Sequence, residues 1–249
     1  MFTRLNFRDG DSTRCFGPNT WLTTMHPPEV ISRETMAYAV DGNDVAVGIH
    51  GYNVDEALPA LSMVYDNLKD AYPVFCALTW PGSKMRLGYW PAEQRADEAG
   101  QRLAEAFAGL PYRSLDVQGH SCGCRVALEA VRAGLRVRNL ILAAAAVDNE
   151  SVQVDKKYGA YLQTNCEHVL VAYSHNDAVL KKAFRVSSYL KRLARFKLWG
   201  DDCKALGYTG PQNPEKCPFN LEAVEIPSIT GHSRYKDNKD YFDAWLRLI

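Results

Sequence analysis

The sequence predicts a three-layer α/β fold, in which helices flank a mostly parallel central sheet on both faces. Short apolar runs, each the length of one buried strand, alternate with longer segments whose apolar residues recur at helical spacing. Strands that alternate with helices favour parallel pairing, and burial of such a sheet on both faces explains why the runs are almost continuously apolar. With 249 residues, of which 47% are hydrophobic, the chain is long enough to bury the core of a single domain, 1–249.

The first half of the chain supplies two strand–helix pairs after an irregular N-terminal segment, residues 1–33. Residues 45–50 are apolar and predict a strand, and residues 54–71 predict a helix because their apolar side chains fall on one face. Residues 74–80 predict a second buried strand, which a Pro-Gly pair ends. Residues 93–107 predict the next helix, with a stripe of alanine, leucine and phenylalanine as its buried face.

The second half continues the same alternation. The predicted strands are 114–118, 139–146, 168–173 and 221–226, and the predicted helices are 122–133, 149–164, 178–195 and 236–249. Of these helices, 149–164 has the weakest pattern. Residues 199–220 are rich in Gly, Pro and Asp and lack periodicity, which is typical of a lid over an active site or of an irregular connector.

The composition and charge of the chain argue against several classes of protein. Lys and Arg total 29, as do Asp and Glu, so the zero net charge gives no sign of a nucleic-acid or acidic-membrane partner. No signal peptide and no apolar stretch long enough to span a bilayer is recognisable, so we expect a cytoplasmic protein. The seven cysteines contain no C-x-x-C pair and predict neither a zinc site nor a disulfide framework. An oxidising setting would allow Cys203 and Cys217 to pair, but free thiols are the favoured interpretation.

The segment Gly119-His120-Ser121-Cys122-Gly123 joins a predicted strand to a predicted helix. A G-x-S-x-G sequence in that context is typical of a nucleophile elbow, a strained turn that lifts the serine hydroxyl above the carboxyl end of the strand. The two glycines relieve crowding around the turn. The first amide of the following helix, that of Cys122, is then aimed where an oxyanion would develop.

This segment has two other interpretations. Ser121 would simply cap the helix if the glycines marked an ordinary turn, but the strand–turn–helix context disfavours this. Cys122 and Cys124 are the competing nucleophiles. Because Cys122 follows the apex of the turn, its side chain should point elsewhere, so we interpret both cysteines as small core residues.

A second oxyanion donor is expected in the loop after the strand that precedes the first long helix. This strand ends in His50-Gly51-Tyr52, where Gly51 lets the backbone approach the reaction centre closely. The backbone N–H of Tyr52 is therefore the candidate donor, beside that of Cys122. His50 is interpreted as a structural histidine that forms hydrogen bonds within the loop.

A serine hydroxyl needs a base, and three of the six histidines follow Ser121. His168 opens a strand and is expected to be buried. His175 lies in the loop where the acid of a triad is expected. His232 follows the last predicted strand and precedes the last helix, which is the place of the base in a Ser…acid…His order. His232 is the predicted base.

The acid that orients the base has two candidates, each just past the end of a strand. Asp177 follows the strand 168–173 and Asp148 follows the strand before it. The later strand is the commoner place, so Asp177 is preferred, although its position also suits a helix N-cap. Asp148 stays open as the alternative acid or as a carboxylate that braces a loop.

Short motifs spread from residue 50 to about residue 235 also carry a family resemblance. They are 50–53, 79–82, Tyr89, 119–123, 144–148, 173–180, 205–211 and 231–233. In these motifs the chain resembles bacterial α/β-hydrolases grouped as a domain of unknown function and distantly similar to lipases and esterases. The resemblance implies a three-layer α/β-hydrolase fold and a triad of Ser121, Asp177 and His232. The family commonly has Met where this chain has Cys122, a change that removes no backbone donor.

Few residues of the sequence indicate the substrate. Trp80, Tyr89 and Trp90 follow the carboxyl end of a strand, where ligands of α/β sheets bind, and they are either pocket residues or structural anchors. Together the features predict a serine hydrolase that cleaves small-molecule or lipid-like esters through an acyl-enzyme, with no metal or cofactor. The same triad also serves amidases, thioesterases and acyltransferases, and a non-catalytic binding protein is the alternative from another class. Dehalogenases and epoxide hydrolases typically carry aspartate at the elbow, where this chain has Ser121.

Overall fold

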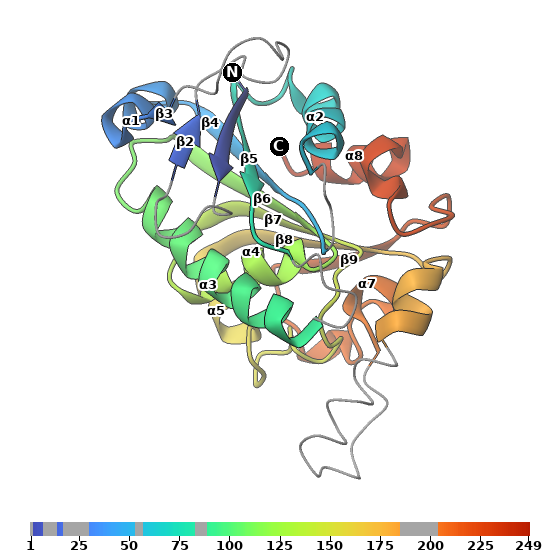
Figure 1. Ribbon diagram of the computed structural model, residues 1–249. Coiled ribbons are helices and arrows are strands. Elements are labelled where there is room, and N and C mark those ends of the chain that lie inside the picture. Colours follow the sequence, from blue (N-terminus) through green and yellow to red (C-terminus); the bar gives the residue numbers. More distant parts are fainter. Residues whose placement is uncertain (1, 7–13, 17–29, 53–56, 83–88, 185–203) are drawn as a thin grey trace.

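In the part of the chain that the structure describes, nine strands form one sheet at the centre of the molecule (Figure 1). The computed structural model describes residues 2–6, 14–16, 30–52, 57–82, 89–184 and 204–249. The strand order is β3-β2-β1-β5-β4-β6-β7-β8-β9. The strands are β1 Phe2–Asn6, β2 Arg14–Phe16, β3 Val30–Ile31, β4 Asp44–Ile49, β5 Val74–Thr79, β6 Ser114–His120, β7 Val137–Ala143, β8 Cys166–Tyr173 and β9 Leu221–Glu225. Neighbouring strands in the run β1-β5-β4-β6-β7-β8-β9 all pair in parallel. The antiparallel pairs are β1 with β2 and β2 with β3, at one edge of the sheet.

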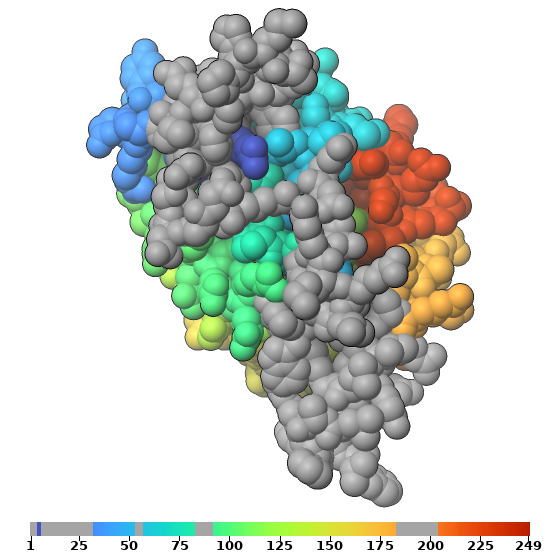
Figure 2. Space-filling model, viewed as in Figure 1, coloured from blue at the N-terminus to red at the C-terminus, as the bar shows by residue number. Residues whose placement is uncertain are grey.

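Helices cover both faces of this sheet, which confirms the predicted three-layer α/β fold. The α-helices are α1 Arg33–Val40, α2 Ala57–Leu68, α3 Tyr89–Phe107, α4 Gly123–Arg132, α5 Gly159–Asn165, α7 Leu206–Thr209 and α8 Lys239–Leu246. Helices α2 and α8 lie on one face and α3, α4 and α5 on the other (Figure 1). In the space-filling view, the side chains of α2 and α8 adjoin one another (Figure 2). None of the described helices is both long and apolar enough to cross a bilayer.

Most predicted elements are present, and the differences have local causes. The predicted strand 139–146 ends at Ala143, because Ala144 turns the chain with a φ of 48°. The predicted helix 149–164 is wrong for its first ten residues, which form successive turns before α5. The predicted last helix is broken at Asn238, whose side chain accepts from Tyr241 N and caps α8 after a short 3-10 helix, η3 Arg234–Asp237.

Two other predicted segments are described only in part. Of the helix predicted at 178–195, the described portion contains a π-helix, η1 Leu180–Phe184, and the remainder lies outside the described residues. Of the predicted lid or connector at 199–220, residues 204–220 pack on the protein. Ala205 forms a β-bridge with Asp148, and Gly207 N donates to Ala145 O at 2.9 Å.

Helix α4 follows the turn at Ser121 and is held tightly against α3. A Cβ at Gly100 of α3 would lie 2.5 Å from Glu129 Cβ, so the two helices touch backbone to side chain at this point. Arg125 of α4 forms two hydrogen bonds with Asp97 of α3, at 2.6 and 2.9 Å. Two parallel N–H···O bonds fix an orientation as well as a distance. The first turn of α4 is thereby fixed relative to α3.

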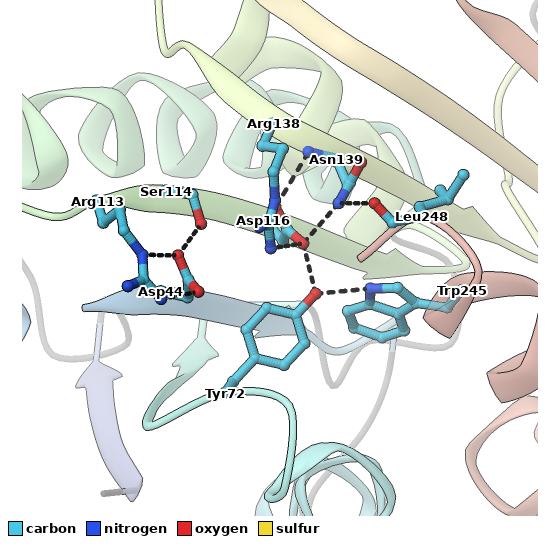
Figure 3. A network of polar contacts seen from close by, with 9 residues as sticks. All are labelled: Asp44, Tyr72, Arg113, Ser114, Asp116, Arg138, Asn139, Trp245 and Leu248. Carbon is cyan, nitrogen blue, oxygen red and sulfur yellow. Dashed lines mark hydrogen bonds and ion pairs between the residues drawn. The ribbon is translucent and has the colours of Figure 1, made fainter. Parts of the chain in front are cut away.

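A buried polar network links the sheet to the C-terminal helix α8, at the end opposite the turn at Ser121 (Figure 3). Asp116 of β6 is fully buried and accepts two hydrogen bonds from Arg138, at 3.0 and 2.9 Å. It also accepts from the Tyr72 hydroxyl and from Asn139 Nδ2, the latter at 2.8 Å. The Tyr72 hydroxyl in turn accepts from Trp245 Nε1 of α8 at 3.0 Å. This network links the last helix to strands β6 and β7.

Parallel pairing brings the carboxyl ends of β4, β6, β7, β8 and β9 to the same edge of the sheet, opposite this network. Ligands of open α/β sheets bind outside the carboxyl ends of the strands. The segments that follow these strands carry Gly51, Ser121, Ala144, Asp177 and His232. Any site built from these residues therefore lies at this edge.

Candidate active site

Ser121 sits at a strained turn between β6, which ends at His120, and α4, which begins at Gly123. Its φ is 56°, and among the described non-glycine residues only Ala144 shares this left-handed conformation. The turn is braced from the neighbouring strand, since Ser121 N donates to Ala143 O at 2.9 Å and Ser121 O accepts from Ala146 N at 3.2 Å. Strain of this kind persists only where surrounding structure holds it in place.

The two glycines of the turn are required by close backbone contacts. A Cβ at Gly119 would lie 2.6 Å from the backbone of Cys124, and a Cβ at Gly123 would lie 2.5 Å from His50 O. Real Cβ atoms do not approach so closely, so neither position has room for a side chain. The Gly-x-Ser-x-Gly spacing therefore has a steric origin in this fold, as the elbow interpretation requires.

His232 reaches the Ser121 hydroxyl from the loop between β9 and η3. Its Nε2 lies 2.8 Å from Ser121 Oγ, and its Nδ1 lies 2.7 Å from Asp177 Oδ2. The carboxylate can only accept, so Nδ1–H donates to Asp177 and Nε2 is free to accept from the serine hydroxyl. The structure thus brings the three residues of the predicted triad within hydrogen-bonding distance in the Ser–His–Asp order.

Asp177 uses its two carboxylate oxygens for two different purposes. Oδ2 accepts from His232, while Oδ1 accepts from the backbone N–H groups of Val179 and Leu180, at 3.1 and 3.0 Å. The side chain is completely buried. The alternatives of triad acid and helix cap are therefore compatible, because each uses a separate oxygen. Asp148, the other candidate acid, is exposed and pairs with Ala205 in a β-bridge, whereas the His232 hydrogen bond goes to Asp177.

The other two late histidines lie in different surroundings. The expectation that His168 is buried is wrong: it is exposed together with Glu167, and continuous burial along β8 begins at the next residue, Val169. His175 is also exposed, and its Nδ1 lies 2.8 Å from Glu225 Oε1. The contact of His175 is thus with Glu225 and not with Ser121.

The loop after β4 lies directly against the elbow. A Cβ at Gly51 would fall 2.9 Å from Ser121 Cβ, so glycine permits the backbone to touch the serine. Tyr52, the predicted oxyanion donor, is the next residue, and Cys122, the second predicted donor, occupies the N-cap position of α4. The roles of these two N–H groups remain predictions.

His50 and Trp80 hold this loop in place. Trp80 N donates to His50 Nε2 at 3.1 Å, so the proton is on Nδ1, which donates to Gly51 O at 2.7 Å. Trp80 Nε1 also donates to His50 O at 2.8 Å, and the two rings stack with centroids 5.8 Å apart. Of the two interpretations of Trp80, these contacts and its complete burial favour the anchor. Tyr89 and Trp90 open α3, but their side chains lie outside the described residues.

The elbow cysteines differ from Ser121 in their surroundings. Cys124 is buried, and its thiol donates to Gly119 O at 3.1 Å and to Ala143 O at 3.3 Å. Burial raises the pKa of this thiol well above its usual value, so it stays protonated and unreactive. Cys122 is 6% exposed and belongs to the core. Both side chains pack as the sequence predicted.

His120 is a site residue that the sequence analysis did not single out. Its Nε2 donates to His232 O at 2.7 Å, and the two imidazole rings lie 5.0 Å apart. Burial, with a smaller contribution from His232, lowers the pKa of His120 to about 4. At neutral pH the ring is therefore uncharged, with its proton on Nε2. The only sequence signal was its place beside Ser121, since contact with residue 232 depends on the tertiary fold.

The fold and this arrangement at the strand ends define a class of protein, the α/β hydrolases. The chain matches the family described as "Alpha/beta hydrolase of unknown function (DUF900)" over residues 32–204, more than half of its length. It belongs to this family. A comparison with curated proteins finds no match.

Solved structures also resemble the protein at low sequence identity. An uncharacterized protein from Bacillus cereus ATCC 10987 is 16% identical with a TM-score of 0.50, and the match covers 91% of this chain and 62% of that one. This similarity shows the fold. The esterase Pf2001 from Pyrococcus furiosus is 11% identical (TM-score 0.49, covering 84% and 83% of the two chains). The protein TT1662 from Thermus thermophilus is 15% identical (TM-score 0.49, covering 84% and 88%).

Proposed function

We propose that the protein is a serine hydrolase that cleaves carboxylic esters through an acyl-enzyme. The observation that carries the proposal is the continuous chain of hydrogen bonds from Ser121 Oγ through His232 to Asp177, with distances of 2.8 and 2.7 Å. A nucleophile, a base within hydrogen-bonding reach and a third group that orients the base together make an activated serine.

In the first half of the reaction, His232 Nε2 takes the proton of Ser121 Oγ as the oxygen attacks the ester carbonyl. The negative charge develops on the former carbonyl oxygen, where the N–H groups of Tyr52 and Cys122 are proposed to donate. His232 then gives its proton to the departing alkoxide, and an alcohol leaves. Throughout, the buried carboxylate of Asp177 stabilises the positively charged imidazole.

In the second half, His232 takes a proton from a water molecule, which attacks the acyl carbonyl. The acid product leaves as the proton returns to Ser121 Oγ, and the enzyme is regenerated. Amides and thioesters present the same carbonyl to the same serine, and an alcohol in place of water would give acyl transfer. Esters are proposed in preference to amides because an alkoxide is a better leaving group than an amide anion, and the triad offers one general acid to assist it.

The test is covalent labelling with a fluorophosphonate probe, run beside hydrolysis of 4-nitrophenyl esters of increasing acyl length. The wild-type protein should be labelled and should release nitrophenol, whereas Ser121→Ala should do neither. Ser151→Ala, which changes a serine in a surface turn, is the matched control and should behave as the wild type. Labelling that survives in Ser121→Ala would contradict the proposal, as would a wild-type protein that is neither labelled nor active on any ester. Hydrolysis rates on amide and thioester substrates with the same acyl group show which leaving group the protein prefers.

A further inference from the structure

A cavity lies beside the triad, between helix α2 and the C-terminal elements η3 and α8. Its volume is about 240 Å³. Helix α2 packs against η3 in this region, and α2 and α8 lie on the same face of the sheet (Figures 1 and 2). Gly51, His120 and Ser233 contribute to the cavity wall, but Ser121, Asp177 and His232 are not among its described lining residues. It is therefore a space separate from the reacting atoms.

The two sides of the cavity have different chemical character. Helix α2 contributes an apolar wall formed by Pro59, Ala60, Leu61 and Val64. The facing wall is polar and comes from three elements, with Gln118 on β6, Tyr235 on η3 and Tyr241 on α8. These three residues are only 2%, 1% and 0% exposed.

The polar wall carries hydrogen-bonding atoms that the protein does not use. Gln118 Oε1 and the hydroxyls of Tyr235 and Tyr241 are buried and make no hydrogen bond within the described part of the chain. Burial raises the pKa of both tyrosines well above the usual value, and the neighbouring Gln118 side chain acts in the opposite direction on the pKa of Tyr241. Leaving a buried polar group unpaired is unfavourable, so three such groups around one cavity indicate an occupant that pairs with them.

The lining also limits the charge of that occupant. At neutral pH the two phenols, the amide and His120 are uncharged, and a charged group would lose its hydration without gaining an ion partner among them. Lys236 also lines the cavity; it repels an ammonium ion and would attract a carboxylate, so the argument against a carboxylate depends on Gln118 Oε1. A carboxylate would place its oxygens against Gln118 Oε1, where acceptor would meet acceptor.

An alcohol meets these requirements. Its hydroxyl donates to Gln118 Oε1 and accepts from a tyrosine hydroxyl, while its carbon chain packs on the apolar wall of α2. We propose that this cavity is a binding site for a small neutral aliphatic alcohol. The proposal does not depend on ester hydrolysis, since it rests on the cavity and its unpaired groups alone.

The test measures binding of 1-hexanol to the Ser121→Ala protein by ligand-observed NMR, so that loss of catalysis cannot affect the result. We expect saturable binding, with hexanoate and hexylammonium binding at least about tenfold more weakly, as expected when a charge must be buried. Gln118→Leu should weaken hexanol binding by about tenfold, the loss expected for one neutral hydrogen bond.

Two further variants separate this site from general surface binding. Ala60→Phe should fill the cavity from the opposite wall and abolish binding, whereas Met63→Phe adds the same ring on the outer side of α2 and should leave binding unchanged. Circular dichroism establishes that each variant is folded. Hexanol that fails to saturate, that is unaffected by both Gln118→Leu and Ala60→Phe, or that binds no better than hexanoate would overturn the proposal. The first of these results is the one expected if the cavity holds only water.

Discussion

At the scale of single residues, the two oxygens of Asp177 make a prediction that separates catalysis from stability. In Asp177→Asn, the amide oxygen can still accept from Val179 and Leu180, but the other position becomes an N–H₂ group that cannot accept from His232 Nδ1. We expect kcat on a nitrophenyl ester to fall by about a thousandfold or more, as when the acid of a triad is made neutral. The melting temperature should change little by comparison.

Asp148→Asn is the matched control, because Asp148 is the other aspartate that follows a strand end. Its turnover should stay close to that of the wild type. A larger loss of kcat in Asp148→Asn than in Asp177→Asn would reassign the acid.

His120 makes the folded state sensitive to acid. Its pKa is lowered from 6.5 to about 4, so below pH 6.5 the unfolded chain binds a proton that the folded protein does not. Stability from this group is therefore complete above pH 6.5 and is lost as pH falls toward 4, by up to about 2 kcal/mol because the ring keeps some contact with solvent. The nearby charges that enter this balance are those of His232, Asp177 and Lys236.

Urea unfolding between pH 4 and 7 measures the effect of His120. In His120→Gln, the amide nitrogen can replace Nε2 as the donor to His232 O but does not titrate, so this variant should lose less stability over the range than the wild type. His120→Leu removes the donor, and we expect a lower kcat for it than for His120→Gln. Identical pH dependence in all three proteins would show that His120 does not contribute.

At the scale of secondary-structure elements, the strand–turn–helix unit around Ser121 depends on its two glycines. Gly119→Ala would force a methyl group to within 2.6 Å of the Cys124 backbone, and backbone atoms cannot rotate away as a side chain can. We expect a loss of about 1–3 kcal/mol in the free energy of unfolding, together with loss of fluorophosphonate labelling. Gly231→Ala is the control for stability, since its nearest atom would be 3.9 Å away, and it should unfold like the wild type.

Some of these strands, turns and helices could be predicted from the sequence and others could not. Strands β4, β5 and β8 were predicted to within about two residues because each contains a local apolar run. The turn at Ala144 was missed, since alanine gives no sign of a left-handed conformation that is held by hydrogen bonds from elsewhere. The turns before α5 were missed because mixed apolar and polar residues satisfy a helical pattern equally well.

For the site, the order of residues along the chain was sufficient to choose Ser121, Asp177 and His232. The contacts of His120 and the unpaired atoms around the cavity beside α2 were not predictable, because no sequence motif marks the residues that meet there. Sequence spacing carries information about the next turn of chain, whereas these contacts depend on how the layers pack.

At the scale of the whole molecule, the Asp116 network should dominate stability at the end of the sheet remote from the site. Asp116→Asn keeps the shape of the side chain but leaves Arg138 without its carboxylate partner. We expect a loss of about 3 kcal/mol or more in the free energy of unfolding, as when one partner of a buried ion pair is removed. Thermal or urea unfolding measures this directly.

The exposed pair of Lys239 and Asp243 on α8 provides the comparison. Asp243→Asn should leave stability unchanged within error, since exposed ion pairs contribute little. Equal effects of Asp116→Asn and Asp243→Asn would mean that the buried network contributes no more than a surface pair.

The late position of His232 in the chain has a consequence for biosynthesis. A growing polypeptide folds from its N-terminal part first, and the elbow at Ser121 is complete long before residue 232 has been added. On the proposed mechanism, the serine has no base until residue 232 has been added. It would become reactive only once the loop that carries His232 has folded back onto the elbow.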